Sequence, residues 1–454
     1  MSTVFDQDRN EGGLPALAIM LVLIVALVID IDLALWQERD RVIEHDVHGY
    51  YAYLPALFIY DDIKLVKSEY REGDYYYFWP NYTPEGHRLI KYTVGSAIMY
   101  APFFFIADII AAPLGYARSG FSLPYKLALL VNALFYLGAG LFLIRLILLR
   151  SGTSGAISAL VIVCIGLGTN LLCYATANGA MPHVHGFFLV TAIMLLSSKW
   201  LEDPNNWNSV LLGLVIGLAV LVRPALVIYS VIPFLFMLSN EQRPYPQLKR
   251  RIKRIGLMAL AAFCTLLPQF IYWHEVTGSW IYYSYQDEGF FWGHPVIQRG
   301  LFGFRKGWLI YTPMMLFSVI GLFMMKNGSR KVIIPVVALH IYITFSWWCW
   351  WYGGTFGQRA MIETYGVLSI PMAAAFSWLM KRSALVRVSA FIMIFFLIFL
   401  NIFQMYQYEE GSIHYEAMTR EAYQAQFLRM QKVQGFEQML DYPDYEAAKK
   451  GLAR

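Results

Sequence analysis

The sequence predicts an all-α membrane protein whose chain crosses the bilayer many times. Of its 454 residues, 58% are apolar and 15% are charged, and the mean hydropathy is +0.46, whereas soluble globular proteins carry roughly 25% charged residues. Long windows are almost free of charge, beginning with residues 14–29, and about 20 apolar residues are enough to cross a hydrocarbon core of roughly 30 Å. This composition excludes a small soluble enzyme, a disordered scaffold and a DNA-binding domain, so no nucleic-acid partner is expected.

Apolar runs that are bounded by charged or turn residues predict about eleven transmembrane helices. The first run is preceded by a polar, mixed-charge segment and is not followed by a small-residue cleavage site, which favours a retained span over a signal peptide. A break is expected at Arg223–Pro224, because one helix over residues 208–240 would measure roughly 50 Å. The predicted spans lie near residues 14–36, 125–149, 156–174, 183–199, 208–222, 224–240, 255–272, 308–326, 332–351, 364–380 and 386–405.

Basic residues are concentrated on one side of this arrangement. With the N-terminus inside, the predicted cytoplasmic loops hold fifteen basic residues against three acidic ones, Glu202, Asp203 and Glu241. The positive-inside rule then predicts the orientation of the whole chain. The basic residues are Arg145, Arg150, Lys199, Arg243, Lys249, Arg250, Arg251, Lys253, Arg254, Lys326, Arg330, Lys331, Lys381, Arg382 and Arg387.

Three large segments fall on the opposite, outer face: residues 37–123, residues 273–307 and a C-terminal tail of residues 406–454. They hold most of the acidic residues and many tyrosines and tryptophans, as is typical of a membrane interface. Residues 96–114 are long enough to span, but two prolines and an aspartate interrupt them. The sidedness of the basic loops favours an interfacial helix there, and we expect residues 1–405 to form one transmembrane domain.

The strongest signal for chemistry follows the first predicted span. Asp46 lies in residues 44–56 (EHDVHGYYAYLPA), an aromatic-rich segment just beyond that span. A carboxylate at the membrane surface can accept a proton from an acceptor hydroxyl or amine, which is the work of a general base. The alternative is that Asp46 caps the following helix, because aspartate is a favoured N-cap residue. The further candidate substrate contacts in this segment are His45, His48, Tyr50 and Tyr51.

Residues 44–56 resemble the opening of the GT-C superfamily of integral-membrane glycosyltransferases, which includes the protein O-mannosyltransferases and the aminoarabinose transferases of lipid A. In that superfamily an acidic residue follows the first span and precedes juxtamembrane helices, and Asp46 with its tyrosine pair matches this position. Residues 91–96 (KYTVGS), 100–103 (YAPF) and 120–125 (GFSLPY) are similar to a related bacterial pattern. The resemblance covers the layout of residues 1 to about 405 and does not extend to the tail.

The resemblance implies a GT-C-like helix bundle with juxtamembrane helices on its outer face. It also implies an inverting transfer of a sugar from a polyprenyl-phosphate donor to a glycan, lipid or protein acceptor, with Asp46 as general base. The enzyme would lie among the lipids of a bacterial inner membrane, with its site facing the periplasm or exterior. No glycine-rich loop follows a strand in the sequence, so a nucleotide-sugar donor is not expected.

Such a transferase needs cations at the departing phosphate. Arg223, at the outer end of a predicted span, is the leading candidate, because an arginine fork suits phosphate oxygens. Members of the superfamily often have lysine there, and Pro224 departs from their pattern. The other candidates for the donor phosphate are Arg305, Lys306 and Arg359, and those for further substrate contacts are Lys91, His183, His185 and Glu363.

Each of these residues also has a structural interpretation. An arginine at a span end can reach out to lipid headgroups. Residues 353–359 (GGTFGQR) resemble a glycine-rich segment of some bacterial members, but the same residues suit a tight interfacial turn in which Arg359 pairs with Glu363. The aromatic loop of residues 273–307 equally suits a membrane-interface belt.

No cofactor is clearly indicated by the sequence. Asp46 with His45 or His48 has a spacing that permits a divalent metal, which some GT-C enzymes use, but the spacing is not diagnostic. The four cysteines lack the short paired spacing of a zinc site or a local disulfide. A metal is therefore possible, and none is expected.

Two other classes of function remain open. A transporter or flippase of a lipid-linked sugar would share the basic and aromatic surfaces, although it is expected to carry internal repeats and broken helices at the membrane midplane. A noncatalytic membrane scaffold could use the long outer tail to bind a partner.

Overall fold

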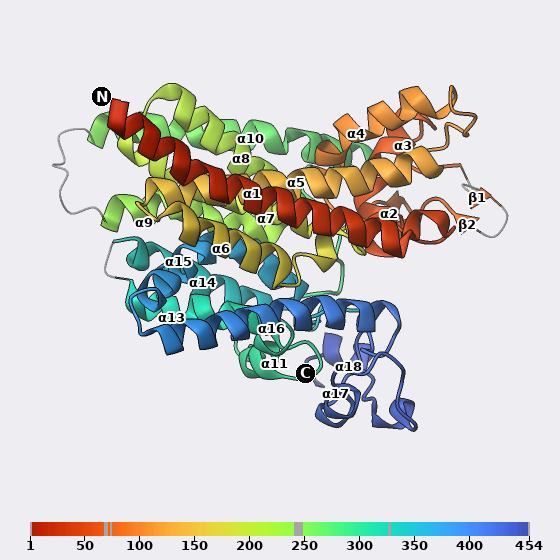
Figure 1. Cartoon of the computed structure of the whole chain (residues 1–454). Helices are drawn as coiled ribbons and strands as arrows, with labels where there is room; N and C mark the ends of the chain where they lie inside the picture. Colours follow the sequence, from red (N-terminus) through yellow and green to blue (C-terminus); the bar gives the residue numbers. More distant parts are fainter. Residues whose placement is uncertain (1, 68–70, 73–74, 240–247, 326–327, 453–454) are drawn as a thin grey trace. The chain divides into compact units, whose positions relative to one another are not determined.

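The computed structural model describes residues 2–67, 71–72, 75–239, 248–325 and 328–452. Its secondary structure is almost entirely helical (Figure 1), in agreement with the predicted all-α class. Two short antiparallel strand pairs join β1 (Arg71–Glu72) to β2 (Tyr75–Tyr76) and β3 (Asn81–Tyr82) to β4 (Arg88–Leu89). Three charged residues of the predicted cytoplasmic loops, Glu241, Arg243 and Lys326, lie outside the described residues.

Seven helices of the described chain are long and apolar enough to cross a membrane. Five shorter apolar segments occupy the other four predicted spans and the region of residues 96–114. These helices indicate a multi-pass membrane protein, while the number of eleven spans stays a prediction. The long helices are α1 (Ser2–Leu33), α5 (Leu123–Arg150), α7 (His183–Glu202), α10 (Leu248–Thr277), α14 (Ser329–Ser346), α15 (Tyr365–Leu379) with the preceding η6 (Arg359–Thr364), and α16 (Ala384–Glu409).

The shorter apolar segments are α4 (Gly95–Ala111), α6 (Gly155–Leu167), α8 (Asn206–Val222), η3 (Pro224–Val231) with α9 (Ile232–Ser239), and η5 (Pro313–Met315) with α13 (Leu316–Met324). The remaining elements lie in the connections and the tail: η1 (Leu35–Gln37), α2 (Asp46–Tyr51), α3 (Tyr53–Phe58), η2 (Cys173–Ala175), α11 (Ile297–Phe302), α12 (Trp308–Tyr311), α17 (Arg420–Gln426), η7 (Phe436–Met439) and α18 (Tyr445–Lys449).

The predicted break between α8 and η3 is confirmed. Helix α8 ends at Val222, and Arg223 has an extended backbone with φ −151° and ψ 118°. The 3-10 helix η3 then begins with Pro224, whose fixed φ and missing N–H suit the first position of a helix. Arg223 is therefore held between two helices and not inside one.

Two predicted spans are shorter or more broken than expected. The third ends at Leu167, where Asn401 Nδ2 donates to the carbonyls of Leu167 and Thr169 at 2.8 and 2.9 Å. The eighth is interrupted at Thr312, because the proline that follows disfavours helical backbone in the residue before it. At the first break, a side chain distant in sequence supplies hydrogen bonds in place of the helical ones, which is how non-helical backbone is tolerated at membrane depth.

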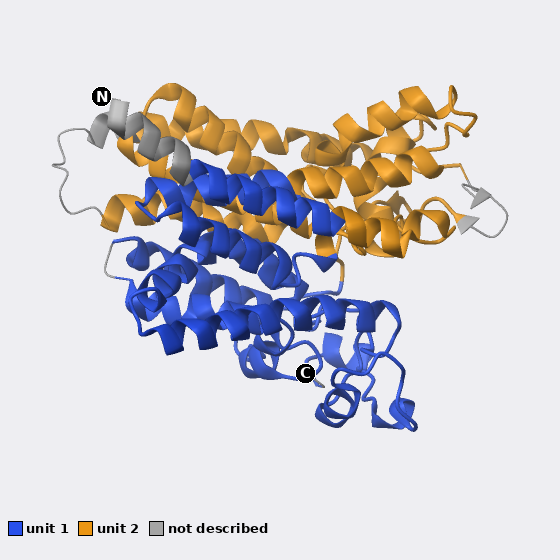
Figure 2. Cartoon of the chain, viewed as in Figure 1, with its two compact units in different colours: residues 1–26, 137–173, 287–454 blue, residues 27–136, 174–286 orange. Residues whose placement is uncertain are grey.

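The chain divides into two compact units (Figure 2). Unit 1 contains residues 1–26, 137–173 and 287–454, and unit 2 contains residues 27–136 and 174–286. In unit 2, α8 packs against α7 and α10, and the end of α9 lies far from α2 and α3 (Figure 1). Helix α4 contacts α2, α3 and α8, so it lies with the elements of the first outer segment.

Unit 1 contains the C-terminal tail. Helix α17 lies beside the C-terminal end of α16 (Figure 1), where Gln404 Nε2 donates to the Tyr423 hydroxyl and Gln407 Nε2 donates to the carbonyl of Gln426. Within the same unit α13 packs closely on α15, and a Cβ added at Gly321 would meet the backbone carbonyl of Pro371. Such small-residue contacts are typical of helix packing in membranes.

Candidate functional site

Asp46 is the first residue of α2 and lies in unit 2. The position before the helix is taken by His45, which has φ 44° and ψ −124° and makes no side-chain capping bond. The structure therefore does not support the interpretation of Asp46 as the N-cap. A positive φ at a non-glycine residue costs on the order of 1–3 kcal/mol, so the surrounding contacts must hold this turn in place.

The half-buried Asp46 carboxylate is bound by a tyrosine from another part of the first outer segment. The Tyr92 hydroxyl donates to Asp46 Oδ1 at 2.6 Å. The Tyr92 ring stacks on Tyr50, with centroids 4.0 Å apart and planes inclined by 16°. Burial and the neighbouring Asp46 raise the pKa of Tyr92, so the phenol stays protonated and donates.

An ammonium group lies beside this pair. The Nζ atom of Lys91 is 5.9 Å from the ring centroid of Tyr92 and 5.2 Å from that of Tyr285, within the range of cation–π attraction. We call the five residues Asp46, Tyr50, Lys91, Tyr92 and Tyr285 the Asp46 cluster. It combines a held carboxylate, a cation and aromatic rings, all within unit 2.

Four hydrogen bonds hold the backbone of residues 90–94, which positions Lys91 and Tyr92 of the Asp46 cluster. Tyr272 Oη and Gln269 Oε1 of α10 accept from the amides of residues 90 and 94 at 2.8 Å each. The hydroxyls of Tyr53 and Ser284 donate to the carbonyls of residues 92 and 91 at 2.7 and 2.6 Å. The segment is therefore anchored from both sides, and Tyr92 has a defined position relative to α2.

The same segment leads to the end of α8. A Cβ added at Gly95 would meet backbone atoms of Leu221 and Val222, the last two residues of that helix. Tyr92 and Gly95 are three positions apart in the sequence, a reach of at most roughly 11 Å. The Asp46 cluster and Arg223 consequently belong to the same region of unit 2.

Arg223 and His183 lie together in unit 2, and their contact with a donor stays a prediction. Arg223 is half-buried, and its Nη1 is 3.2 Å from Nδ1 of His183, the first residue of α7. His183 is 2% exposed and packs edge-on against Tyr174 at a centroid distance of 5.0 Å. The guanidinium therefore has a fixed neighbour in the described chain.

Two histidines of the first outer segment differ in exposure. His45 is exposed, whereas His48 is 2% exposed and stacks on Trp79 with centroids 4.3 Å apart. Burial lowers the pKa of His48 to about 4, so its ring is neutral at neutral pH. In this structure the His48 ring packs against Trp79, and its role as a substrate contact stays a prediction.

Tyr51 and His185 are also enclosed by the chain. The Tyr51 hydroxyl donates to the carbonyl of Gly120 at 2.6 Å, and its side chain is 1% exposed. His185 Nε2 lies 2.8 Å from Asn132 Oδ1 in the interior of unit 2. Neither belongs to the Asp46 cluster, and their role as substrate contacts stays a prediction.

Four of the predicted residues, Arg305, Lys306, Arg359 and Glu363, lie in unit 1. The Lys306 side chain is 2% exposed, and Nζ donates to the carbonyls of Thr355 and Tyr415. Burial, with a smaller effect of Arg359, lowers the pKa of Lys306. Its ammonium thus joins the glycine-rich loop to the C-terminal tail.

Arg305 also binds the tail. Its Nη2 donates to Asp441 Oδ2 at 2.7 Å and its Nη1 to the carbonyl of Glu416 at 3.1 Å. Arg359 is half-buried and Glu363 fully buried, both in η6. The tail, which the resemblance does not cover, therefore contacts two of the predicted phosphate-binding residues directly.

Among the residues that the structure describes, no three His, Cys, Asp or Glu side chains lie close enough together to hold a metal ion. All four cysteines are free thiols. The sequence also did not identify Tyr92 as part of the site, although the motif at residues 91–96 contains it.

No protein-family model matches the sequence, and no curated protein matches it. The likeness to GT-C transferases therefore depends on the short motifs alone.

The Asp46 cluster can perform one kind of chemistry well. The Tyr92 hydroxyl orients the Asp46 carboxylate. Because Asp46 is half-buried, one part of its side chain contacts the protein and another part is exposed. Such a group can take a proton from a hydroxyl or an amine that is placed beside it. The guanidinium of Arg223, in the same region, can bind an anionic group of the molecule that this nucleophile attacks.

Proposed function

We propose that the chain is a membrane glycosyltransferase of the GT-C type that transfers a sugar from a polyprenyl-phosphate donor to an acceptor hydroxyl or amine. The observation that carries the proposal is the bond from the Tyr92 hydroxyl to Asp46 Oδ1, in a half-buried cluster directly after the first long helix. Its location supports a role at the membrane surface, where a lipid-linked donor and a second substrate can meet.

In the proposed reaction, Asp46 removes the proton from the acceptor nucleophile as that atom attacks the anomeric carbon. The bond between this carbon and the phosphate oxygen breaks, its electron pair leaves with the polyprenyl phosphate, and the configuration inverts. Tyr92 orients the carboxylate. Arg223 stabilises the departing phosphate, because a guanidinium fork donates two parallel hydrogen bonds to its oxygens.

Arg223 is preferred to Lys306 for this role. The Lys306 ammonium is enclosed by two backbone carbonyls, whereas Arg223 is half-buried in the same unit as Asp46. Arg305 and Arg359 remain further candidates for the phosphate. The distribution of basic residues in the sequence supports placing the reaction on the outer face of a bacterial inner membrane.

The test uses the purified chain with a radiolabelled polyprenyl-phosphate sugar and a membrane extract as acceptor. Asp46→Asn is expected to lower the transfer rate by about 10²–10⁴-fold, the usual contribution of general acid–base catalysis. Asp40→Asn, an exposed aspartate of the same loop, is the matched control and should keep the wild-type rate. Unchanged transfer by Asp46→Asn would remove Asp46 from the catalytic role.

A transporter of lipid-linked sugar is the second candidate. The interruptions after Leu167 and at Thr312 resemble the broken helices of transporters. Movement of the labelled lipid between the leaflets of proteoliposomes, without transfer of its sugar, would favour this candidate over the transferase.

A further inference from the structure

A dense group of basic residues begins α10 in unit 2. Residues 249–254, named here the basic group, have the sequence KRRIKR, and no acidic residue follows in the helix before Glu275. The uncharged stretch of residues 255–273 comes next. At 1.5 Å per residue it measures about 28 Å, close to the roughly 30 Å of a hydrocarbon core. In a membrane that α10 crosses, the basic group therefore lies at the level of the lipid phosphates.

Trp207 supports this level. It lies at the start of α8, which packs against α10 (Figure 1). A Cβ added at Gly213 would meet Met258. One added at Gly217, a turn later, would meet Ala262, so the two helices run in parallel. Trp207 precedes Gly213 and thus lies near the level of the basic group, and it is 70% exposed, as is typical of a tryptophan at a membrane interface.

An exposed apolar stripe continues from Lys253 along α10. Four exposed residues follow this lysine at alternating steps of three and four, which places them on one face of the helix: Gly256, Leu260, Phe263 and Leu267. The space beside Gly256 is open. From Lys253 to Leu267 the stripe is about 21 Å long, more than the roughly 15 Å that one leaflet contributes to the core. It can therefore contact an acyl chain along the whole depth of a leaflet.

Lys253 stands at the membrane-surface end of this stripe. Its side chain is exposed and makes no hydrogen bond or ion pair with any residue that the structure describes. Lys249 precedes it by one helical turn on the same face, and Arg250 lies on the adjoining face. A positive charge without a partner in the described chain thus adjoins an exposed apolar surface.

We propose that this face of α10 binds an anionic phospholipid, whose phosphate lies at Lys253 and whose acyl chains lie along the stripe. Clusters of lysine and arginine next to a membrane span attract anionic headgroups. An ammonium group is a compact charge that binds a phosphate without requiring one geometry. The proposal is independent of sugar transfer, because lipid binding is measured directly.

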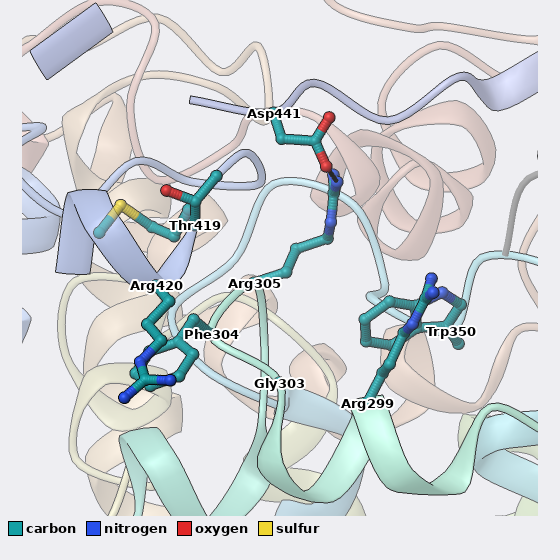
Figure 3. A pocket seen from close by; sticks show the side chains of 9 residues that line it. Arg299, Gly303, Phe304, Arg305, Trp350, Thr419, Arg420 and Asp441 are labelled. Atoms are coloured by element: carbon teal, nitrogen blue, oxygen red, sulfur yellow. Dashed lines mark hydrogen bonds and ion pairs between the residues drawn. The ribbon is translucent and has the colours of Figure 1, made fainter. Parts of the chain in front are cut away.

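The arginines that line the pocket of unit 1 are arranged differently. The side chains of Arg299, Arg305 and Arg420 point to different sides of that pocket (Figure 3). Arg305 donates to Asp441 at 2.7 Å. These three residues do not form one cationic site, whereas the basic group lies at one end of a single helix.

The test titrates the full-length chain in a non-ionic detergent with phosphatidylglycerol or phosphatidylcholine and measures the bound lipid by native mass spectrometry. The wild type should bind phosphatidylglycerol more tightly, because the headgroup of phosphatidylcholine has no net charge. Lys253→Gln should weaken binding of phosphatidylglycerol by about fivefold, and the charge reversal Lys253→Glu by roughly 25-fold. The affinity for phosphatidylcholine should be the same in all three proteins.

Lys381→Glu is the matched control, because Lys381 is an exposed lysine next to α16, the last long helix. It changes the net charge equally and should keep the wild-type preference for phosphatidylglycerol. Equal affinity for phosphatidylglycerol in the wild type and Lys253→Glu overturns the proposal. An equal loss of affinity in Lys381→Glu overturns it too, because net charge would then explain the preference.

Two further measurements separate this site from a folding defect and from a site for soluble phosphate. Without added lipid, Lys253→Glu should melt as the wild type does, and phosphatidylglycerol should raise the melting temperature of the wild type more than that of the variant. A lower melting temperature of the lipid-free variant would show that Lys253 has a partner in the chain and would overturn the proposal. Glycerol 3-phosphate, which has no acyl chains, should not displace the bound lipid. Displacement by it would overturn the role of the stripe.

Discussion

Tyr92→Phe removes one hydroxyl from the Asp46 cluster and leaves the ring that stacks on Tyr50. In the wild type this hydroxyl donates to Asp46 Oδ1 at 2.6 Å. The backbone of Tyr92 keeps its hydrogen bond from Tyr53. The substitution therefore tests a single contact, the one on which the position of the proposed general base depends.

The expected coupling free energy between Tyr92 and Asp46 depends on the charge of the acceptor and on its burial. A hydrogen bond to a charged group contributes roughly 1.5–3 kcal/mol to stability, and one between neutral groups about 1 kcal/mol. Asp46 is half-buried and partly screened by water, so we expect a coupling near the lower limit, about 1.5 kcal/mol. Tyr53→Phe, which removes a hydroxyl from a neutral carbonyl acceptor at 2.7 Å, should cost about 1 kcal/mol.

The assay is a double-mutant cycle on Tyr92→Phe and Asp46→Ala, with unfolding by sodium dodecyl sulfate in mixed micelles followed by circular dichroism. Alanine is used at position 46 because asparagine would still accept from the tyrosine. A coupling free energy below about 0.5 kcal/mol, the usual error of additivity, would refute the claim that Tyr92 holds Asp46. A loss of stability in Tyr92→Phe that persists unchanged in the Asp46→Ala background would refute it equally.

Three further outcomes are expected. Lys306→Met removes the ammonium group that donates hydrogen bonds to two backbone carbonyls, so it should lower the free energy of unfolding by about 2 kcal/mol. Because one of these carbonyls belongs to the C-terminal tail, the tail should also become more sensitive to limited proteolysis. Gly321→Ala would place a Cβ against the carbonyl of Pro371 and should destabilise by about 1–3 kcal/mol in detergent melts, whereas Gly256→Ala, with open space around it, should be neutral or slightly stabilising. His48 has a pKa of about 4 in the folded chain, below its ordinary value, so the unfolded state binds the proton first as the pH falls. Stability should therefore drop by up to about 3 kcal/mol between pH 6.5 and 4, and His48→Gln should reduce that slope in melts over this range.

Helix type and position were largely predictable, because they depend on local patterns. Apolar runs identified every long helix, and the dipeptide Arg223–Pro224 identified the break after α8. The end of α6 at Leu167 was not predictable, since Asn401 supplies its hydrogen bonds from 234 residues away in sequence. Local hydropathy carries no information about such a distant donor.

The candidate site, like the fold, was predictable from the sequence only in part. The charge and position of Asp46 after the first span were evident from the sequence, because the chain must leave the membrane there. The hydrogen bond to Asp46 from Tyr92, 46 residues further on, was not evident from the sequence. The bond from the buried Lys306 to a tail carbonyl 109 residues away was not evident either.

The amino-acid order by itself determined that this is a helical, membrane-type chain with an acidic residue beyond its first span, because hydrophobicity and charge act residue by residue. Only the tertiary structure decided which groups meet: Asp46 with Tyr92, Arg223 with His183, and Arg305 with Asp441. The physical reason is that hydrogen bonds and ion pairs require contact within about 3 Å, which folding creates between residues that no local pattern connects.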